Sequence, residues 1–176
     1  EPARVPLDLP DLPTGALTLE AAGAALAALM PEGAILCNEA ITSGFRFAPP
    51  LGAARPHDVI GGTGGSIGWA LPGAVGAAVA CPDRKVVALT GDGSAMYTIQ
   101  SLWTMAREQL DVTVIVFANR SYQILRDELL NVGVQSYGAN AQAMFELSRP
   151  DLDFVQIAQG HGVPASRPET LEDYVQ

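Results

Sequence analysis

The stretch that decides the fold is Val86-Val87-Ala88-Leu89-Thr90-Gly91-Asp92-Gly93-Ser94. Its first five residues form a nearly unbroken apolar run, which is typical of a strand buried on both faces of a parallel sheet. A second run of this kind, at 112–118, ends at Asn119. Between the runs, apolar residues recur at helical spacing, namely Ile99, Leu102, Trp103, Ala106 and Leu110. The order strand, helix, strand predicts a right-handed βαβ crossover.

Asp92 and Asn119 each follow one of these two predicted strands. Because the carboxyl ends of parallel strands meet at one edge, we expect the carboxylate and the amide side by side, where open α/β sheets bind ligands. Such oxygens suit Mg²⁺ or Ca²⁺ better than zinc. A helix that opens at Ser94 would direct its free N–H groups toward a diphosphate. Alone, Gly-Asp-Gly-Ser is more often a plain turn, and the matching Asn119 favours a site.

The composition is that of one folded α/β domain. Of the 176 residues, 48% are hydrophobic and 16% are charged, which is too apolar for a disordered chain. A net charge of −9 without a Lys/Arg cluster argues against nucleic acid and anionic membranes as partners. We expect no signal peptide, and the sequence contains no apolar run long enough to span a bilayer. We interpret Cys37 and Cys81 as free, buried thiols of a cytoplasmic protein. His57 and His161 lack metal-ligand spacing, so solvated or structural roles are expected.

Prolines at positions 2, 6, 10 and 13 predict an extended linker over residues 1–16 that leads from a preceding domain. Residues 17–176 are expected to form the domain itself. It opens with a helix over 18–30, a strand over 33–37 and a loop over 44–58.

A glycine run, Gly61-Gly62-Thr63-Gly64-Gly65-Ser66-Ile67-Gly68, comes next. A dinucleotide fingerprint would need glycine in place of Ile67, so that interpretation fails. The run is still too rich in glycine for a plain turn, and we expect a ligand or another part of the chain to approach its backbone. A helix over 69–80 is predicted to pack closely on the sheet.

Beyond the second strand the periodicity weakens. We predict a short helix over 120–126 and a loop over 131–150, which at that length is usually functional or mobile. A helix over 154–161 and a strand over 163–165 follow. A capping box at 166–169 is expected to begin the last helix.

The motif and its surroundings identify a family. Gly91-Asp92-Gly93-Ser94, with Asn119 at the usual distance, resembles the metal and diphosphate motif of thiamine-diphosphate-dependent enzymes. From Asn38-Glu39 through 68–72 to Arg126, the chain is similar to benzoylformate decarboxylase and to large-subunit homologues of acetolactate synthase. The resemblance implies their C-terminal diphosphate-binding domain, an α/β fold with a mainly parallel sheet flanked by helices on both faces. It also implies that the domain is truncated within its last helix.

The resemblance implies a metal site and a diphosphate site. Asp92, the side chain of Asn119 and the backbone carbonyl of Ser121 would ligate Mg²⁺. The diphosphate of thiamine diphosphate would be held by Gly93, Ser94 and Thr42.

Four further residues would contact the rest of the cofactor. The Gly65 carbonyl would accept a hydrogen bond from the 4′-amino group, and the stiff side chain of Ile67 would hold the cofactor in its bent form. Tyr122 and Leu125 would line the cofactor and substrate side. Without the resemblance, plain core packing is the preferred role for Ile67, Tyr122 and Leu125.

Two positions depart from the family pattern. Ala118 replaces an asparagine that is common there, which leaves the ligand position unchanged. Asp127 and Glu128 stand where benzoylformate decarboxylase has apolar aromatic residues and acetolactate synthases have Gln and Trp. Two acids would disfavour an aromatic 2-keto acid, unless they face solvent at a helix end.

The implied chemistry is attack of the cofactor ylide on a 2-keto acid with loss of CO₂. The activating glutamate is expected on the pyrimidine-binding domain of a partner subunit in a homodimer or homotetramer, because neither Glu20 nor Glu39 matches it. No catalytic residue is therefore expected in this chain, which alone would be inactive. The alternative is a non-catalytic cofactor-binding or dimerisation module, or a separate subunit that acts only in trans. A nucleotide-binding regulatory domain is disfavoured, since the chain has no P-loop.

Overall fold

The computed structural model describes residues 9–176, so the first half of the predicted linker, residues 1–8, lies outside the described residues. Four parallel strands form one sheet in the order β2-β1-β3-β4. They are β1 (Ile35–Asn38), β2 (Asp58–Gly61), β3 (Val86–Gly91) and β4 (Val112–Phe117). The strands predicted before Asp92 and Asn119 are thus present as neighbours in the sheet. Burial on both faces is confirmed for β3 but not for β4, which is an edge strand whose residues are only partly buried or exposed.

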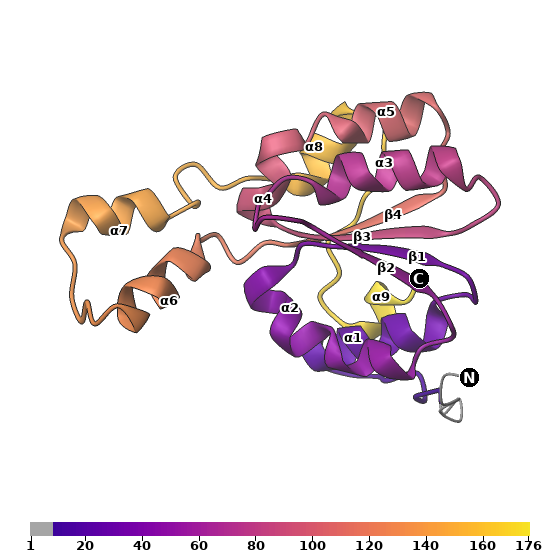
Figure 1. Cartoon of the computed structure of the whole chain (residues 1–176), viewed down its shortest axis with the longest axis horizontal. Helices are drawn as coiled ribbons and strands as arrows, with labels where there is room; N and C mark the ends of the chain where they lie inside the picture. The colour runs from indigo at the N-terminus through magenta and orange to yellow at the C-terminus, as the bar shows by residue number, and fades with distance from the viewer. Residues whose placement is uncertain (1–8) are drawn as a thin grey trace.

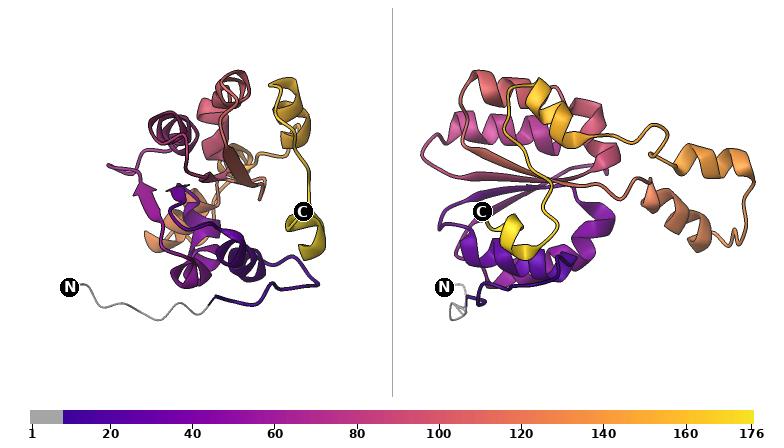
Figure 2. Two further views of the ribbon diagram at one scale, coloured as in Figure 1. Left: turned by 90° about the vertical axis from the view of Figure 1, so that its right-hand side faces the viewer. Right: turned by 180° about the vertical axis from the view of Figure 1, so that it is seen from behind.

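Helices cover both faces of the sheet (Figures 1 and 2). One layer consists of α3 (Ala70–Ala80), α4 (Asp92–Thr98), α5 (Ser101–Arg107) and α8 (Phe154–Gly160). The other consists of α1 (Leu19–Leu29), α2 (Ile41–Phe47), the 3₁₀ helix η1 (Pro49–Ala53) and α9 (Leu171–Tyr174). This arrangement confirms the predicted α/β class.

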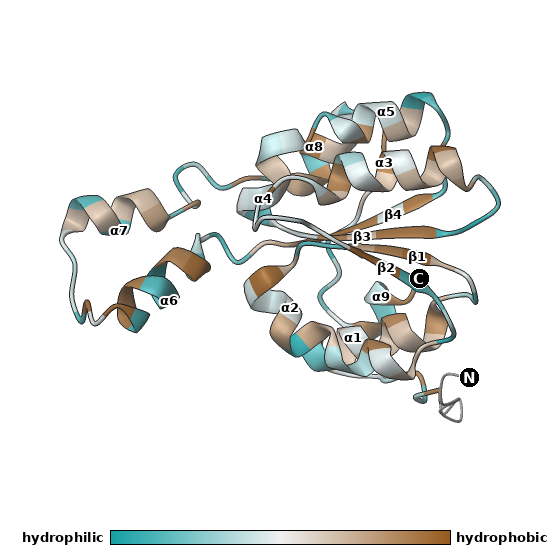
Figure 3. Cartoon of the chain, viewed as in Figure 1, coloured by the Kyte–Doolittle hydropathy of each residue, from teal (hydrophilic) through white to brown (hydrophobic). Residues whose placement is uncertain are grey.

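Strand β3 shows why its sequence is apolar without alternation. Val86 and Ala88 belong to the apolar cluster that includes α3 and α5, whereas Val87 and Leu89 belong to the cluster that includes α1 and α2. None of these four residues is more than 3% exposed. A strand covered on both faces has no solvent-facing position for a polar residue. Figure 3 shows the same pattern, with hydrophobic colour along the strands.

Small residues bring the helices close to their neighbours. Ala70, Ala74 and Ala78, spaced four residues apart on α3, are all buried in the core. In the other layer, a Cβ atom added to Gly23 of α1 would lie 2.0 Å from the carbonyl oxygen of Phe47. The contact between α1 and the end of α2 therefore depends on the absence of a side chain at Gly23.

The crossover between β3 and β4 differs from the single predicted helix. It consists of α4 and α5, with residues 99 and 100 between them. Leu102 is buried, but Trp103 is 52% exposed and the Arg107 guanidinium lies over its ring at 5.3 Å. A short helix buries only a narrow stripe, so one of the predicted core positions faces outward.

The predicted loop over 44–58 is wrong in part, because it contains most of α2 and all of η1 and meets β2. Pro49 and Pro50 occupy the first positions of η1, where no backbone donor is needed. Strand β2 is an edge strand whose four residues are all exposed, and its two apolar residues, Val59 and Ile60, are too few to form an apolar pattern.

The second half of the chain contains two helices that project together from the body, α6 (Gln123–Asn131) and α7 (Ala139–Phe145) (Figure 1). Helix α6 replaces the shorter helix predicted over 120–126, and α7 lies inside the predicted loop over 131–150. The helix predicted over 154–161 is confirmed as α8, capped by the Asp153 carboxylate.

Two expectations near the C-terminus are wrong. Residues 163–165 do not form a strand in the described part of the chain. The capping box lies at Thr170 and Asp173, at the start of α9, and not at 166–169. Gly15 and Ala16, in the described part of the predicted linker, pair with the start of α9 through Leu171 and Thr170.

The cysteines are both free thiols, as predicted. Cys37 is fully buried in β1, and burial raises its pKa to about 11. Cys81 is only half-buried, because it follows the end of α3. The Nδ1 atoms of His57 and His161 each lie 2.8 Å from a backbone carbonyl oxygen, which suits structural roles. None of the described helices is both long and apolar enough to cross a bilayer.

Candidate active site

Asp92 is a buried carboxylate at the carboxyl edge of the sheet. It is the first residue of α4, directly after β3, and is 4% exposed. Its Oδ2 accepts a hydrogen bond from the backbone N–H of Arg120 at 2.6 Å, and its Oδ1 accepts one from the Gly93 N–H at 2.9 Å. Burial raises the pKa of Asp92, and these backbone hydrogen bonds oppose that rise only in part. A cation at the remaining oxygen lone pairs would favour the charged form.

The loop after β4 wraps around this carboxylate. Arg120 has a positive φ of 59°, which turns the chain sharply after Asn119. The Asn119 Oδ1 accepts a hydrogen bond from the Ser121 N–H at 3.0 Å, and the Arg120 carbonyl accepts one from Leu147 at 2.8 Å. Asn119 and Ser121 are thus held on either side of the residue that binds Asp92. The structure brings the three predicted metal ligands to one loop junction.

Tyr122 lies against the backbone of Gly93. A Cβ atom added to Gly93 would come within 2.3 Å of the Tyr122 ring. Burial raises the pKa of Tyr122, and the charges of Tyr97 and Asp92 add to the effect. The absence of a side chain at Gly93 therefore makes room for the tyrosine ring. Tyr122 itself is fixed by its N–H, which donates to the carbonyl of Phe145 at 2.9 Å.

The last residue of the glycine run, Gly68, packs against helix α4. This helix also carries Asp92, Gly93 and Ser94. Gly68 has a φ of +83°, and a Cβ atom there would lie 2.5 Å from the Cβ of Tyr97. The Thr98 hydroxyl donates to the Gly68 carbonyl at 2.7 Å. Another part of the chain thus approaches the run, as predicted. Gly65 is exposed and Ile67 is half-buried at the same edge.

Thr42 and Leu125 lie on two helices that contact each other, α2 and α6. Thr42 is half-buried, in the second position of α2, and Leu125 is 46% exposed on α6. Both follow the carboxyl ends of strands, β1 and β4. Their proposed contacts with a cofactor stay predictions.

The two acids that depart from the family pattern lie within α6 and not at its end. Asp127 is half-buried, and its Oδ1 accepts a hydrogen bond from the side chain of Gln123 at 2.8 Å. Glu128 is exposed and accepts one from Asn131. Glu128 therefore faces solvent, whereas Asp127 is engaged along the helix.

Sequence reasoning missed the role of Glu39. This residue follows β1 and is only 5% exposed. Its Oε2 accepts hydrogen bonds from the N–H groups of Trp69 and Ala70 at 2.9 and 3.1 Å, and its Oε1 accepts one from the Thr90 hydroxyl at 2.5 Å. One signal was available, because α3 begins at Ala70 and the residue before it, Trp69, offers no capping side chain.

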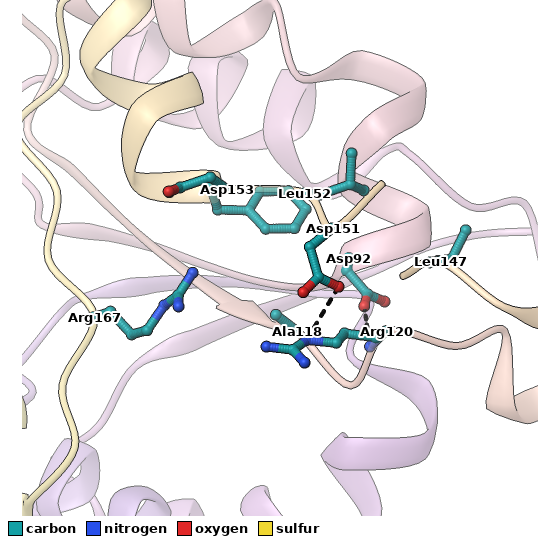
Figure 4. A pocket seen from close by; sticks show the side chains of 9 residues that line it. Asp92, Ala118, Arg120, Leu147, Asp151, Leu152, Asp153 and Arg167 are labelled. Atoms are coloured by element: carbon teal, nitrogen blue, oxygen red, sulfur yellow. Dashed lines mark hydrogen bonds and ion pairs between the residues drawn. The ribbon is translucent and has the colours of Figure 1, made fainter. Parts of the chain in front are cut away.

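A cavity of about 400 Å³ lies between Asp92 and the start of α8 (Figure 4). Across it, Arg120 Nε lies 3.6 Å from an oxygen of Asp151. Its lining residues carry both charge signs: Asp92, Ala118, Arg120, Leu147, Asp151, Leu152, Asp153, Phe154 and Arg167. Only Asp92 belongs to the predicted cofactor residues. We therefore do not assign this cavity to the cofactor, whose predicted site rests on the donor atoms and the glycine run.

Comparisons with known proteins agree with the motif. Residues 41–176 match the family described as "Thiamine pyrophosphate enzyme, C-terminal TPP binding domain". A Mycobacterium tuberculosis protein named "Putative acetolactate synthase large subunit IlvX" is 50% identical over 166 residues, 94% of this chain and 32% of the relative. Benzoylformate decarboxylase of Pseudomonas aeruginosa is 35% identical over 146 residues, 83% of this chain and 26% of the relative.

A solved structure shares the fold. It is the thiamine diphosphate-dependent 4-hydroxybenzoylformate decarboxylase of Rhodococcus jostii RHA1, with a TM-score of 0.77 and 29% sequence identity. The match covers 99% of this chain and 32% of that one. The chain thus spans about a third or less of the length of these relatives.

Proposed function

The chain belongs to the thiamine pyrophosphate enzymes, as their C-terminal TPP binding domain, and from this premise we propose that it binds thiamine diphosphate through Mg²⁺ at the edge formed by β3 and β4. The observation that carries the proposal is the buried carboxylate of Asp92 beside the loop of Asn119. The proposed ligands are Asp92, the Asn119 amide oxygen and the Ser121 carbonyl.

The residues present fit such an ion. Burial raises the pKa of Asp92, and a divalent cation bound to the carboxylate would lower it again. The donor set is all oxygen, with one carboxylate, and Mg²⁺ usually takes one or two carboxylates and completes its shell with water and phosphate. The Asn119 Oδ1 keeps a second lone pair beyond its bond to Ser121.

The cofactor itself would lie across the edge of the sheet. Gly93, Ser94 and Thr42 would hold its diphosphate, and Tyr122 and Leu125 would line the site. The exposed backbone of Gly65 is open to a ligand, and half-buried Ile67 is anchored close to α4 through Gly68. These positions match a carbonyl acceptor for the aminopyrimidine and an apolar support for the bent cofactor.

When bound, thiamine diphosphate supplies the nucleophilic carbon that adds to a 2-keto acid and the ring that accepts the electrons released with CO₂. The residues of this chain bind and orient the cofactor and exclude water around it. We place the activating glutamate on a pyrimidine-binding domain of a partner subunit, in a homodimer or homotetramer. The proposed activity of the whole protein is decarboxylation or acetolactate synthase-like carboligation of a small 2-keto acid. We also propose a cytoplasmic location.

The proposal is tested on the natural protein that contains this chain, with Mg²⁺ and thiamine diphosphate. Calorimetry should show Mg²⁺-dependent cofactor binding that Asp92→Ala abolishes, because the ion loses its one carboxylate. Asp83→Ala, in an exposed turn, is the matched control and should bind normally. Unchanged affinity in Asp92→Ala would exclude the metal site.

A panel of 2-keto acids, assayed for CO₂ release, tests the activity. Turnover of any member supports the enzyme, and the profile shows whether Asp127 selects a polar substrate. Tight cofactor binding without any turnover would favour the binding or dimerisation module that acts without catalysis.

A further inference from the structure

Glu39 joins three segments that are far apart in the sequence. It follows β1, binds the first residues of α3 through one carboxylate oxygen and binds Thr90 of β3 through the other. Its own N–H donates to the Leu89 carbonyl at 2.9 Å. Every polar contact of this buried side chain is therefore made to a segment that leads into the proposed cofactor site.

The bond to α3 fixes the end of the glycine run. Trp69 and Ala70, which donate to Glu39, directly follow residues 61–68. Helix α3 has no capping side chain of its own, so the carboxylate satisfies two N–H groups that the helix leaves free. Gly68 is held from the other side by Thr98. Residues 62–66 lie between the end of β2 and this anchor and are all exposed, so the anchor fixes one of the two ends of this segment.

The bond to Thr90 connects this anchor to the segment that carries Asp92, the proposed metal ligand. Thr90 is fully buried in β3, two residues before Asp92. One rigid carboxylate thus connects the segment of Gly65 and Ile67 with the segment of Asp92 and Gly93. Buried charge-assisted hydrogen bonds of this kind are stronger than neutral ones and are costly to break.

We propose that Glu39 is a positioning residue that sets the glycine run at the distance from Asp92 that the cofactor requires. This inference rests on the proposed function. Glu39 touches neither cofactor nor substrate in this role, and it acts through Trp69, Ala70 and Thr90.

The test uses Glu39→Ala and Glu39→Gln in the natural protein. Hydrogen exchange of residues 61–70 is measured without ligand, and calorimetry with Mg²⁺ measures cofactor affinity well below the melting temperature. In Glu39→Ala, we expect about tenfold faster exchange at Trp69 and Ala70 and about tenfold weaker cofactor binding, since two helix donors lose a charged acceptor.

Glu39→Gln should bring the exchange rates of Trp69 and Ala70 and the cofactor affinity back to within about threefold of the wild-type values. Its amide oxygen can accept from α3 while its NH₂ group donates to Thr90, whose hydroxyl can turn to the Gly91 carbonyl 3.2 Å away. Glu32→Ala, at an exposed glutamate after α1, is the control. If Glu39→Ala does not fold, Thr90→Val removes one of the three bonds with little change of shape and should shift exchange in the same direction.

The proposal is overturned if Glu39→Ala lowers the melting temperature but leaves exchange and affinity equal to those of Glu32→Ala, which would make Glu39 a purely structural residue. It is also overturned if Glu39→Gln fails to rescue. Wild-type protein that binds no cofactor would refute the proposed function instead, and the exchange of residues 61–70 in ligand-free protein would still decide on the role of Glu39.

Discussion

Arg120 holds a backbone conformation that residues with side chains rarely adopt. Its N–H supplies the short bond to Asp92, whereas its exposed side chain only pairs loosely with Asp151. Exposed pairs of this kind contribute little. The site therefore uses the backbone of Arg120 and not its charge.

We predict that Arg120→Gly keeps cofactor affinity and changes the free energy of unfolding by less than about 1 kcal/mol. Relief of the left-handed strain offsets the greater entropy of glycine in the unfolded chain. Urea denaturation and calorimetry measure the two quantities. Gln109→Gly, at the other non-glycine residue with positive φ among residues 9–176, is the control for strain away from the site. A tenfold loss of affinity only in Arg120→Gly would mean that the guanidinium contacts the ligand.

Cys37 gives a pH dependence with a defined sign. Its thiol ionises near pH 9.0 in the unfolded chain and near 11 in the folded protein. Between these values the unfolded state loses the proton first, so stability falls as pH rises from 9 to 11, by about 2–3 kcal/mol in total. Cys37→Ala should lack this part of the alkaline decline, as measured by denaturation at pH 8, 9, 10 and 11. Parallel declines in both proteins would contradict the burial of the thiol.

At the level of elements, the contact between α1 and α2 depends on Gly23. Because an added Cβ would lie 2.0 Å from the backbone oxygen of Phe47, the two helices would have to move apart. We predict that Gly23→Ala destabilises the protein by about 1–3 kcal/mol in urea denaturation, despite the better helix propensity of alanine. Gly76→Ala on α3, where nothing lies within 4 Å, should instead stabilise by about 0.5–1 kcal/mol. Equal changes in the free energy of unfolding for the two variants would show that α1 shifts to accommodate the added methyl group.

The elements that the sequence predicted correctly are those whose burial leaves a pattern. Strands β3 and β4 carry apolar runs, and α1 and α3 are rich in alanine between clear end signals. Strand β2 was missed because it has only two apolar residues in four, too short a run to be recognised, and its pairing with β1 defines it. Residues 163–165 look like a strand, but no described strand pairs with them.

At the level of the whole molecule, the motif predicted that Asp92 and the loop of Asn119 converge but not what holds the surrounding segments in place. Asp92 and the Asn119 loop meet as expected, since strand order follows from the crossover. Glu39 could not be placed, because its partners lie 30, 31 and 51 residues away. Only the folded sheet, with β1 beside β3, brings its carboxylate to Trp69, Ala70 and Thr90.

The long sequence separations between Glu39 and its partners also bear on the order in which parts of the chain fold. Contacts between residues distant in the sequence carry a larger loop-closure cost than local helices do, and they form late. The bond from Glu39 to Thr90 closes only after β1 and β3 have paired across the intervening helices. We therefore expect the edge proposed to receive the cofactor to become ordered only after these strands have paired, so that an incompletely folded molecule has helices and strand pairs before it has this edge.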